Sequence, residues 1–322
     1  MSREVYVVSA VRTAIGTFGG ALKDTPPTQL GALVVKTSIE RAGVAADQVG
    51  HVVFGHVVNT EPRDMYLSRV AAIDGGCSQG TPAFNVNRLC GSGLQAIVSA
   101  SQAILLGDTD VAIGAGAENM SRAPYASLAT RFGARMGDTK LVDMMVGALH
   151  DPFETIHMGV TAENIAEKWG ISRETQDALA VESHRRAEAA TKAGHFKAQI
   201  VPVMLKSRKG EVAFETDEHF RPDCQIGDMS KLKPVFKKEG GTVTAGNASG
   251  INDAAAAVVL MEGQAMRAQG VQPLARLVAY AHAGVDPRYM GIGPVPATKI
   301  ALEKAGLTIA DLDVILEIQP CF

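Results

Sequence analysis

The sequence is poor in aromatic residues and in net charge, and each shortage excludes a class of protein. Aromatic side chains make up 5% of the 322 residues, and there is a single tryptophan. The formal net charge is -3 at pH 7, which is not the basic footprint of a nucleic-acid-binding protein, so no nucleic-acid partner is expected. The 33 glycines instead predict tight turns and close packing of backbone segments.

Long apolar runs and export signals are also missing from the sequence. We find no stretch of about 18 apolar residues, the length that a membrane-spanning helix needs, and therefore expect no membrane partner. The first residues, M-S-R-E, lead directly into a strand-like run and lack the apolar region and cleavage site of a signal peptide. The expected location is therefore the cytoplasm.

The four cysteines do not form a metal-binding or redox pattern. Cys77, Cys90, Cys224 and Cys321 include no C-x-x-C pair, and their spacing fits no zinc site. In a reducing cytoplasm all four are expected to be free thiols. No metal or redox cofactor is implied.

Alternating strand and helix patterns predict an α/β protein of about two domains. Short β-branched runs mark the strands, and apolar residues at three- and four-residue steps mark the helices. The alternation argues for much parallel pairing between the strands. The expected strands cover residues 4–9, 49–55, 82–86 and 111–116, and residues 253–262 are expected to form a small apolar core element. The expected helices cover residues 28–42, 90–105 and the stretch that follows Ser172 as an N-cap.

Two segments of the sequence resemble each other. Residues 36–54 and 298–316 are each expected to give a helix, a basic residue before Ala-Gly, an apolar residue, an acidic turn and then a β-branched strand. We interpret them as corresponding parts of a duplicated half. A second half as long as the first would continue beyond residue 322, so the second half is expected to be incomplete.

Cys90 lies in N-R-L-C-G-S-G, between an expected strand and an expected helix. The positive end of a helix lowers the pKa of a nearby thiol and favours the nucleophilic thiolate. Gly91 and Gly93 leave room for a thioester, and the N–H groups of residues 90–93 could stabilise an oxyanion. The alternative is a buried, inert cysteine before a helix, and residue type alone does not decide between the two.

Several long motifs, in the same order, resemble those of the thiolase family. The likeness covers residues 3 to about 315 and looks closest to acetyl-CoA acetyltransferases and short-chain β-ketothiolases of bacterial type. The motifs are V-R-T-A-I-G-T-F-G-G at 11–20, N-R-L-C-G-S-G-L-Q-A at 87–96, G-A-G-A-E-N-M-S at 114–121, H-M-G-V-T-A-E-N at 157–164, G-T-V-T-A-G-N-A-S-G-I-N-D at 241–253 and M-G-I-G-P-V-P-A at 290–297.

The resemblance implies a thiolase fold, with duplicated βαβαβαββ halves in five layers and an inserted loop domain. It also implies a homotetramer built as a dimer of dimers. On this basis the N-terminal half comprises residues 1–120 plus 248–271. The loop domain comprises residues 121–247, and a partial C-terminal half comprises residues 272–322.

The resemblance also assigns site residues. Cys90 matches the cysteine that takes the acyl group, His157 and Met158 match positions near the pantetheine, and Arg221 matches an arginine near the nucleotide of coenzyme A. For Arg221 a solvated surface charge is the alternative. For the apolar positions Leu149, Met229, Leu232, Phe236 and Met290, core packing is an equal alternative. The remaining expected coenzyme A contacts are Ala245, Ala248 and Ser249. For Ser249 a serine in an ordinary glycine turn is the alternative, and for His157 a hydrogen-bonded loop histidine is the alternative.

The expected activity is that of a thiolase acyltransferase in fatty acid metabolism. Two acetyl-CoA would give acetoacetyl-CoA and CoA reversibly, or short 3-ketoacyl-CoA would be cleaved, through an acyl-Cys90 intermediate. Coenzyme A thioesters are then substrates, and no resident cofactor is expected. Acyl-chain preference and the direction of the reaction in the cell do not follow from the sequence.

Two alternatives remain. After D-L-D-V-I at 311–315, the family's N-E-A-F, G-H-P and C-x-G motifs do not follow, and the chain reads L-E-I-Q-P-C-F instead. The first alternative is therefore an impaired remnant that binds coenzyme A, or assembles, without turnover. The second is another condensing enzyme, such as a ketoacyl-ACP synthase, but the motifs at 157–164 and 245–250 favour coenzyme A.

Overall fold

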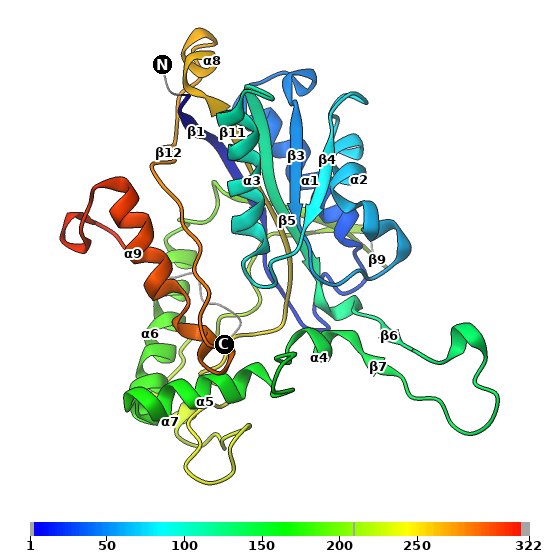
Figure 1. The fold of residues 1–322 in the computed structure, drawn as a ribbon, viewed down its shortest axis with the longest axis vertical. Helices are drawn as coiled ribbons and strands as arrows, with labels where there is room; N and C mark the ends of the chain where they lie inside the picture. The colour runs from blue at the N-terminus through cyan, green and yellow to red at the C-terminus, as the bar shows by residue number, and fades with distance from the viewer. Residues whose placement is uncertain (1–2, 209, 317–322) are drawn as a thin grey trace. The chain divides into compact units, whose positions relative to one another are not determined.

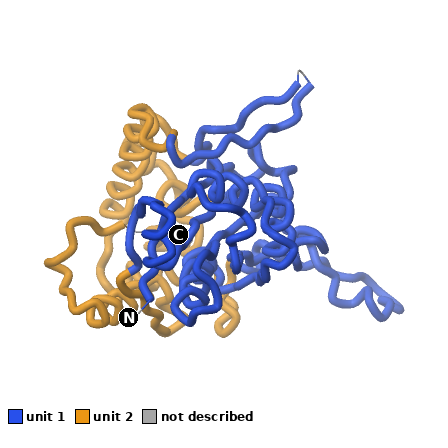
Figure 2. The backbone as a smooth tube through the Cα atoms, turned by 90° about the horizontal axis from the view of Figure 1, so that it is seen from above, with its two compact units in different colours: residues 1–148, 198–219, 251–277 blue, residues 149–197, 220–250, 278–322 orange. Residues whose placement is uncertain are grey.

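The structure is a computed structural model that describes residues 3–208 and 210–316. The chain divides into two compact units (Figure 2). Unit 1 takes residues up to 148 together with 198–219 and 251–277, and unit 2 takes 149–197, 220–250 and the residues from 278 on. The three-part division expected from the sequence stays a prediction.

An eight-stranded mixed sheet forms the centre of unit 1, with the main order β12-β1-β11-β5-β3-β4. All four predicted strands are present, with shifted ends, and the apolar element expected at 253–262 is also a strand. The strands are β1 (Val5–Thr13), β2 (Gly16–Thr17), β3 (His51–Gly55), β4 (Ala83–Val86), β5 (Val111–Asn119), β8 (Ile200–Val201), β11 (Asn252–Glu262) and β12 (Ala275–Arg276).

The expected parallel pairing holds for only part of this sheet. Strand β3 pairs in parallel with β4 and β5, but β11 runs antiparallel between β1 and β5. The pairing of β11 with β5 starts with Asp253 opposite Asn119, the last residue of β5. Because β11 starts where β5 ends, it runs back along β5 in the antiparallel direction, and the sheet is mixed.

Helices cover both faces of this sheet (Figure 1). Along β3, Val52 and Phe54 belong to the apolar cluster that contains the helices α1 and α2. The intervening Val53 belongs to the cluster that contains α3 residues Ala96 and Ile104. Because strand side chains alternate between faces, α3 lies opposite α1 and α2. These helices are α1 (Pro27–Ala42), α2 (Leu67–Asp74) and α3 (Ser92–Leu106).

Helix α3 is more apolar than we expected. The window Leu89–Leu106 is long enough and apolar enough to cross a membrane, with a mean hydropathy of 1.4, so the expectation that no such stretch exists is wrong. However, 44% of this window is buried inside the structure, and Ala96, Ala100 and Ile104 pack in the core. Core helices that cross no membrane often have this length and composition, so the window alone does not establish a membrane span.

Two hairpins and two short helices complete unit 1. The β6–β7 hairpin extends away from the sheet (Figure 1). These elements are β6 (Tyr125–Ala126), β7 (Val142–Asp143), α4 (Met144–Ala148), β9 (Val203–Ser207), β10 (Gly210–Phe214) and α8 (Gly263–Ala268).

Unit 2 is helical in the part that the structure describes. Helix α5 ends at Gly170, whose φ of 64° is the left-handed conformation that favours glycine. Ser172 caps the next helix as predicted, because its Oγ accepts a hydrogen bond of 3.2 Å from the Thr175 N–H. The helices are α5 (Met158–Trp169), α6 (Arg173–Lys192), α7 (Ile226–Met229) and α9 (Pro294–Ala305), with a 3-10 segment η5 (Pro287–Ile292).

The two similar sequence segments begin alike in the structure. Helices α1 and α9 end at Gly43 and Gly306, whose φ values are 67° and 68°. Each is followed by a 3-10 turn, η1 (Ala46–Gln48) and η6 (Ile309–Asp311). In the first segment strand β3 follows. In the second, no strand is described from Asp311 to residue 316, so the strand expected there is wrong for this part of the chain.

Candidate active site

Cys90 lies in the turn between β4 and α3 of unit 1. Helix α3 begins at Ser92 with Gly91 as its N-cap, so Cys90 precedes the helix and does not open it as predicted. Cys90 is exposed, which excludes the alternative of a buried cysteine. The helix N-terminus and its partial positive charge nevertheless lie within two residues of the thiol position.

Ser92 and Asn87 hold this turn in place. The Ser92 hydroxyl donates to the Leu89 carbonyl at 2.6 Å and accepts from the Arg88 N–H at 2.9 Å. The Asn87 side chain accepts from the Leu89 N–H at 2.9 Å. Leu89 has a φ of 44°, a left-handed conformation that costs a non-glycine residue roughly 1–2 kcal/mol. The surrounding hydrogen bonds therefore enforce a strained turn directly before Cys90.

Glycines in the sheet allow α3 to approach closely. A β-carbon at Gly55 in β3 would lie 2.5 Å from the carbonyl carbon of Ser92. A β-carbon at Gly114 in β5 would lie 2.6 Å from the Cα of Ile97. Since real β-carbons do not approach backbone atoms so closely, only glycine fits at these two positions. The sheet thus fixes the start of α3, and with it the Cys90 turn.

Two expectations about the Cys90 turn need correction. The N–H groups of Gly91 and Ser92 donate within the turn, to the Arg88 carbonyl at 3.1 Å and the Leu89 carbonyl at 2.9 Å, so these two amides are already engaged. The sulfur of Cys90 is disulfide-bonded, so it is not the free thiol that we expected. Any nucleophilic role requires that this bond be reduced first.

The other cysteines are distinguished by burial. Cys77 and Cys224 are free thiols, and Cys321 lies outside the described residues. Burial raises the pKa of Cys77 to about 11, so its thiolate is scarce at neutral pH.

Glu118 and Asn119, at the end of β5, stabilise unit 1. Asn119 donates to the Leu22 and Thr25 carbonyls, both at 2.8 Å. The Glu118 carboxylate accepts from the N–H groups of Val57 at 2.8 Å and Val58 at 3.1 Å. Burial raises the pKa of Glu118, although these N–H groups and the nearby His56 oppose the shift.

In unit 2, His157 caps the N-terminus of α5. Its Nδ1 accepts a hydrogen bond of 3.0 Å from the Gly159 N–H, so the neutral ring carries its proton on Nε2. Burial lowers the pKa of His157 below its usual 6.5, and the neighbouring His150 lowers it further. The imidazole is therefore neutral at pH 7 and presents an N–H donor.

Four predicted coenzyme A residues meet at this N-terminus. The His157 ring stacks on the Phe236 ring, with centroids 4.6 Å apart and an interplanar angle of 20°. The Met158 N–H donates to the Leu149 carbonyl at 2.8 Å. A β-carbon at Gly159 would lie 2.1 Å from the Phe236 ring, so glycine is needed there for Phe236 to lie against the helix.

A second group of predicted residues forms around Gly246. A β-carbon at Gly246 would lie 2.4 Å from the Met229 sulfur and 2.5 Å from a Leu232 methyl carbon, so the loop 244–249 packs directly on the segment 229–232. Met229 is only 3% exposed, which favours core packing at this position. Ala245, Ala248 and Ser249 belong to the same loop.

Ser249, Met290 and Arg221 have distinct surroundings. The Ser249 hydroxyl makes a long contact of 3.5 Å with the Gly250 carbonyl, which leaves it able to turn towards a ligand. Met290 lies half-buried in η5, which is tied to α5 by a hydrogen bond of 3.1 Å from Asn164 to the Arg288 carbonyl. Arg221 is exposed, and its N–H donates to Nδ1 of His184 on α6 at 3.2 Å.

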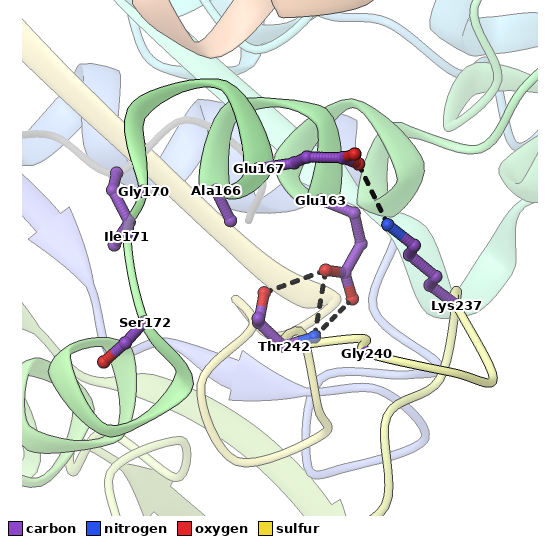
Figure 3. Close-up of a pocket in the computed structure, with 9 residues that line it drawn as sticks. All are labelled: Glu163, Ala166, Glu167, Gly170, Ile171, Ser172, Lys237, Gly240 and Thr242. Atoms are coloured by element: carbon purple, nitrogen blue, oxygen red, sulfur yellow. Dashed lines mark hydrogen bonds and ion pairs between the residues drawn. The ribbon is translucent and has the colours of Figure 1, made fainter.

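Sequence reasoning missed Glu163, which lines a cavity of about 320 Å³ in unit 2 (Figure 3). Its carboxylate accepts from the Thr242 N–H and hydroxyl and from the Val243 N–H, at 2.8–2.9 Å. Glu163 lies within a quoted motif, but its partners are about 80 residues away. The cavity is lined by Glu163, Ala166, Glu167, Gly170, Ile171, Ser172, Lys237, Gly240 and Thr242.

All predicted coenzyme A residues belong to unit 2, whereas Cys90 belongs to unit 1. Within residues 3–208 and 210–316, no group of three or more His, Cys, Asp or Glu side chains is arranged to hold a metal ion. The site residues as a set remain a prediction.

Family comparisons agree with the motifs over almost the whole chain. The model of the thiolase N-terminal domain matches residues 5–264, and that of the thiolase C-terminal domain matches residues 271–322. The chain belongs to the thiolase family. As a thiolase it is an acyltransferase, and the segment that contains Cys90 lies inside the N-terminal domain match.

Curated relatives and solved structures are similar to this thiolase over almost its whole length. Beta-ketothiolase BktB of Cupriavidus necator is 71% identical over 315 residues, which is 98% of this chain and 80% of the relative. An acetyl-CoA acetyltransferase of the same organism is 50% identical over 99% of this chain and 81% of its own length. The crystal structure of the Bacillus anthracis acetyl-CoA acetyltransferase has a TM-score of 0.94 at 42% identity, over 97% of this chain and 79% of that one.

A further solved structure is human mitochondrial 3-ketoacyl-CoA thiolase in complex with CoA. It has a TM-score of 0.93 at 42% identity, and it covers 97% of this chain and 78% of that one. The predicted thiolase fold is therefore confirmed.

Proposed function

We propose that this thiolase transfers acetyl groups between coenzyme A thioesters. Two acetyl-CoA give acetoacetyl-CoA and CoA, and the reverse reaction cleaves short 3-ketoacyl-CoA. The observation that carries the proposal is the exposed Cys90 in a fixed turn before α3, inside the matched family segment. The names of the relatives at 71% and 50% identity support this choice of substrates.

The proposed chemistry proceeds in two transfers. The thiolate of reduced Cys90 attacks the carbonyl of one acetyl-CoA, and CoA leaves as the acyl-Cys90 thioester forms. The α-carbon of a second acetyl-CoA loses a proton to a base and attacks this thioester. The Cys90 thiolate leaves again, and acetoacetyl-CoA is released. A thioester exchanges for a thioester in the first step, so this transfer runs readily in both directions.

We assign coenzyme A binding to unit 2, as a substrate and not as a resident cofactor. The neutral His157 presents its Nε2–H, and Ser249 presents a hydroxyl that is weakly held. Arg221 is exposed, and its planar guanidinium suits a phosphate. These three polar groups would orient a chain-like ligand whose apolar parts contact Met158 and Phe236.

We also propose a homotetramer that acts in the cytoplasm in fatty acid metabolism. Strand β4 lies at the end of the strand order, and its Phe84 is 43% exposed, which suits pairing with another copy. The β6–β7 hairpin carries Phe132, which is 89% exposed, and Met136, which is 96% exposed. Exposed apolar side chains of this kind favour association. The location and the pathway rest on the sequence expectation.

The test is thiolysis of acetoacetyl-CoA by the 322-residue chain and its Cys90→Ala variant, both with reductant. The proposal expects turnover by the unmodified chain and none by the variant. Intact mass after incubation with acetyl-CoA should show one added acetyl group that Cys90→Ala lacks. If the unmodified chain binds CoA but shows neither turnover nor acetylation, the proposed reaction is wrong for this chain and binding without turnover replaces it.

A further inference from the structure

Asp177, on α6, is a buried carboxylate that the proposed chemistry does not use. Only 3% of the residue is exposed. One carboxylate oxygen accepts from Nε of Arg173 at 2.7 Å, and the other accepts from the side-chain amide of Asn247 at 2.9 Å. A charge buried in this way is tolerated only when it is paired, so the identity of its partners indicates its role.

Each partner holds a different backbone segment. Arg173 donates through Nη2 to the Met229 carbonyl at 2.7 Å and to the Leu232 carbonyl at 3.1 Å. Asn247 donates to the Thr242 carbonyl at 2.9 Å and accepts from the Thr244 N–H at 2.7 Å. Asp177 is therefore the centre of a continuous chain of hydrogen bonds.

The two segments that this chain joins also touch one another. A β-carbon at Gly246 would lie within 2.5 Å of both the Met229 sulfur and a Leu232 methyl carbon, so the loop packs closely against these two side chains. On the other side, Glu163 holds Thr242 (Figure 3), and it also accepts a hydrogen bond from the Val243 N–H. The loop 244–249 is thus held from two helices. Glu163 on α5 holds the residues directly before the loop, and Asp177 on α6 holds Asn247 within it.

We propose that Asp177, through Arg173 and Asn247, is a positioning residue for coenzyme A. It sets the spacing between the segment 229–232 and the loop 244–249, so that Ser249 is presented to the pantetheine part of the thioester. This inference rests on the proposed function, because the spacing matters only for a ligand bound at this loop. Asp177 acts through its neighbours, since both carboxylate oxygens are already engaged.

The substitution Asp177→Asn breaks this chain with little change in volume. An amide at position 177 has one accepting oxygen for two donors, so either Arg173 or Asn247 loses its partner. Hydrogen bonds to charged groups are the strong ones, and the two segments are then free to shift. The matched control is Glu182→Gln on the same helix, which removes exposed pairs with Arg185 and Arg186 at 2.6 Å.

The experiment measures CoA binding by calorimetry and acetylation of Cys90 in a single turnover, with reductant. Acetyl-CoA is compared with the acetyl thioester of N-acetylcysteamine, which lacks the nucleotide and most of the pantetheine. Asp177→Asn should weaken CoA binding by roughly tenfold or more. It should slow acetylation by dilute acetyl-CoA by a much larger factor than acetylation by the short thioester. Glu182→Gln should match the unmodified chain.

The outcomes separate this inference from the proposed function. Unchanged CoA affinity in Asp177→Asn, or an equal loss with both thioesters, overturns the positioning role. Failure of the unmodified chain to bind CoA overturns it as well. If CoA binding weakens in Asp177→Asn but no chain acetylates Cys90, the positioning role stands and the proposed reaction fails.

Discussion

Gly55 in β3 and Ser92 at the start of α3 are in direct backbone contact. A β-carbon at Gly55 would lie 2.5 Å from the Ser92 carbonyl carbon and 2.6 Å from the Gly93 nitrogen. Ser92 in turn holds the Leu89 carbonyl and the Arg88 N–H of the turn that presents Cys90. The position of the proposed nucleophile is therefore set from the sheet.

Gly55→Ala tests this relationship. The added methyl group must displace the start of α3, and overpacking of this kind costs about 1–3 kcal/mol of unfolding free energy. We expect that loss in urea unfolding, together with loss of Cys90 acetylation. Gly80→Ala is the control, because its β-carbon would meet Ser78 Oγ at an ordinary 3.5 Å. Normal stability and acetylation in Gly55→Ala would contradict the packing described.

Gly159→Ala tests the contact between α5 and Phe236. Alanine in a helix is normally favoured over glycine by up to about 1 kcal/mol, but here its methyl group would lie 2.1 Å from the ring. We expect the steric clash to outweigh the gain in helix propensity, so the unfolding free energy should fall. CoA binding should weaken because Phe236 moves away from His157. Gly147→Ala in α4 has no atom within 4 Å of its β-carbon and should not destabilise. A stabilised Gly159→Ala would refute the prediction.

Glu163→Gln tests the hydrogen bonds from α5 to Thr242 and Val243, which precede the loop 244–249. The amide offers one accepting oxygen where three donations from Thr242 and Val243 now converge, so an N–H or hydroxyl loses its partner. We expect a loss of about 1–3 kcal/mol in unfolding free energy. Glu167→Gln, on the same helix and cavity, removes an exposed pair with Lys237 and should cost at most about 1 kcal/mol. Equal effects of the two substitutions would argue against the special role of Glu163.

His157→Asn tests the pH dependence of unit 2. Since the folded pKa of His157 lies below 6.5, the unfolded chain binds the proton more readily. The contribution to stability is therefore present above about pH 6.5 and is lost as pH falls through the folded pKa. Asparagine keeps the N-cap but does not titrate. Urea unfolding between about pH 5 and 7.5 should show a smaller loss in the variant, and an identical slope would contradict the assignment.

Alkylation should distinguish the cysteines once the chain is reduced. With a pKa of about 11 and 6% exposure, Cys77 should resist iodoacetamide at about pH 8 in the folded chain and react in urea. Exposed Cys90 should react in the folded chain. Peptide mass spectrometry measures both, and rapid labelling of folded Cys77 would show that its burial is wrong.

Local signals in the sequence predicted the central strands of unit 1, two of its long helices and helix α6 of unit 2. Apolar periodicity gave β1, α1 and α3, and cap chemistry gave the start of α6 at Ser172. The antiparallel direction of β11 was missed, because it depends on where the chain re-enters the sheet. The strand expected after Asp311 was wrong, since a β-branched run forms a strand only when a neighbouring strand pairs with it.

The polar groups that support the predicted coenzyme A residues could not be found from sequence patterns. Asp177 lies among charged residues that look like a solvent-facing helix, yet its amide partner is 70 residues away. Glu163 and Asn247 fall inside recognisable motifs, but spacing does not tell which motif residues touch a ligand and which hold the loop. Only the three-dimensional contacts separate these two roles.

Helix α5 limits how this protein can change by mutation. His157 and Gly159 both contact Phe236, Glu163 holds Val243, and Asn164 holds the Arg288 carbonyl, so this one helix secures three segments around the proposed ligand site. Acyl-chain preference can therefore diverge in small steps along the loops, whereas the helix is expected to stay nearly invariant among thiolases that differ in substrate.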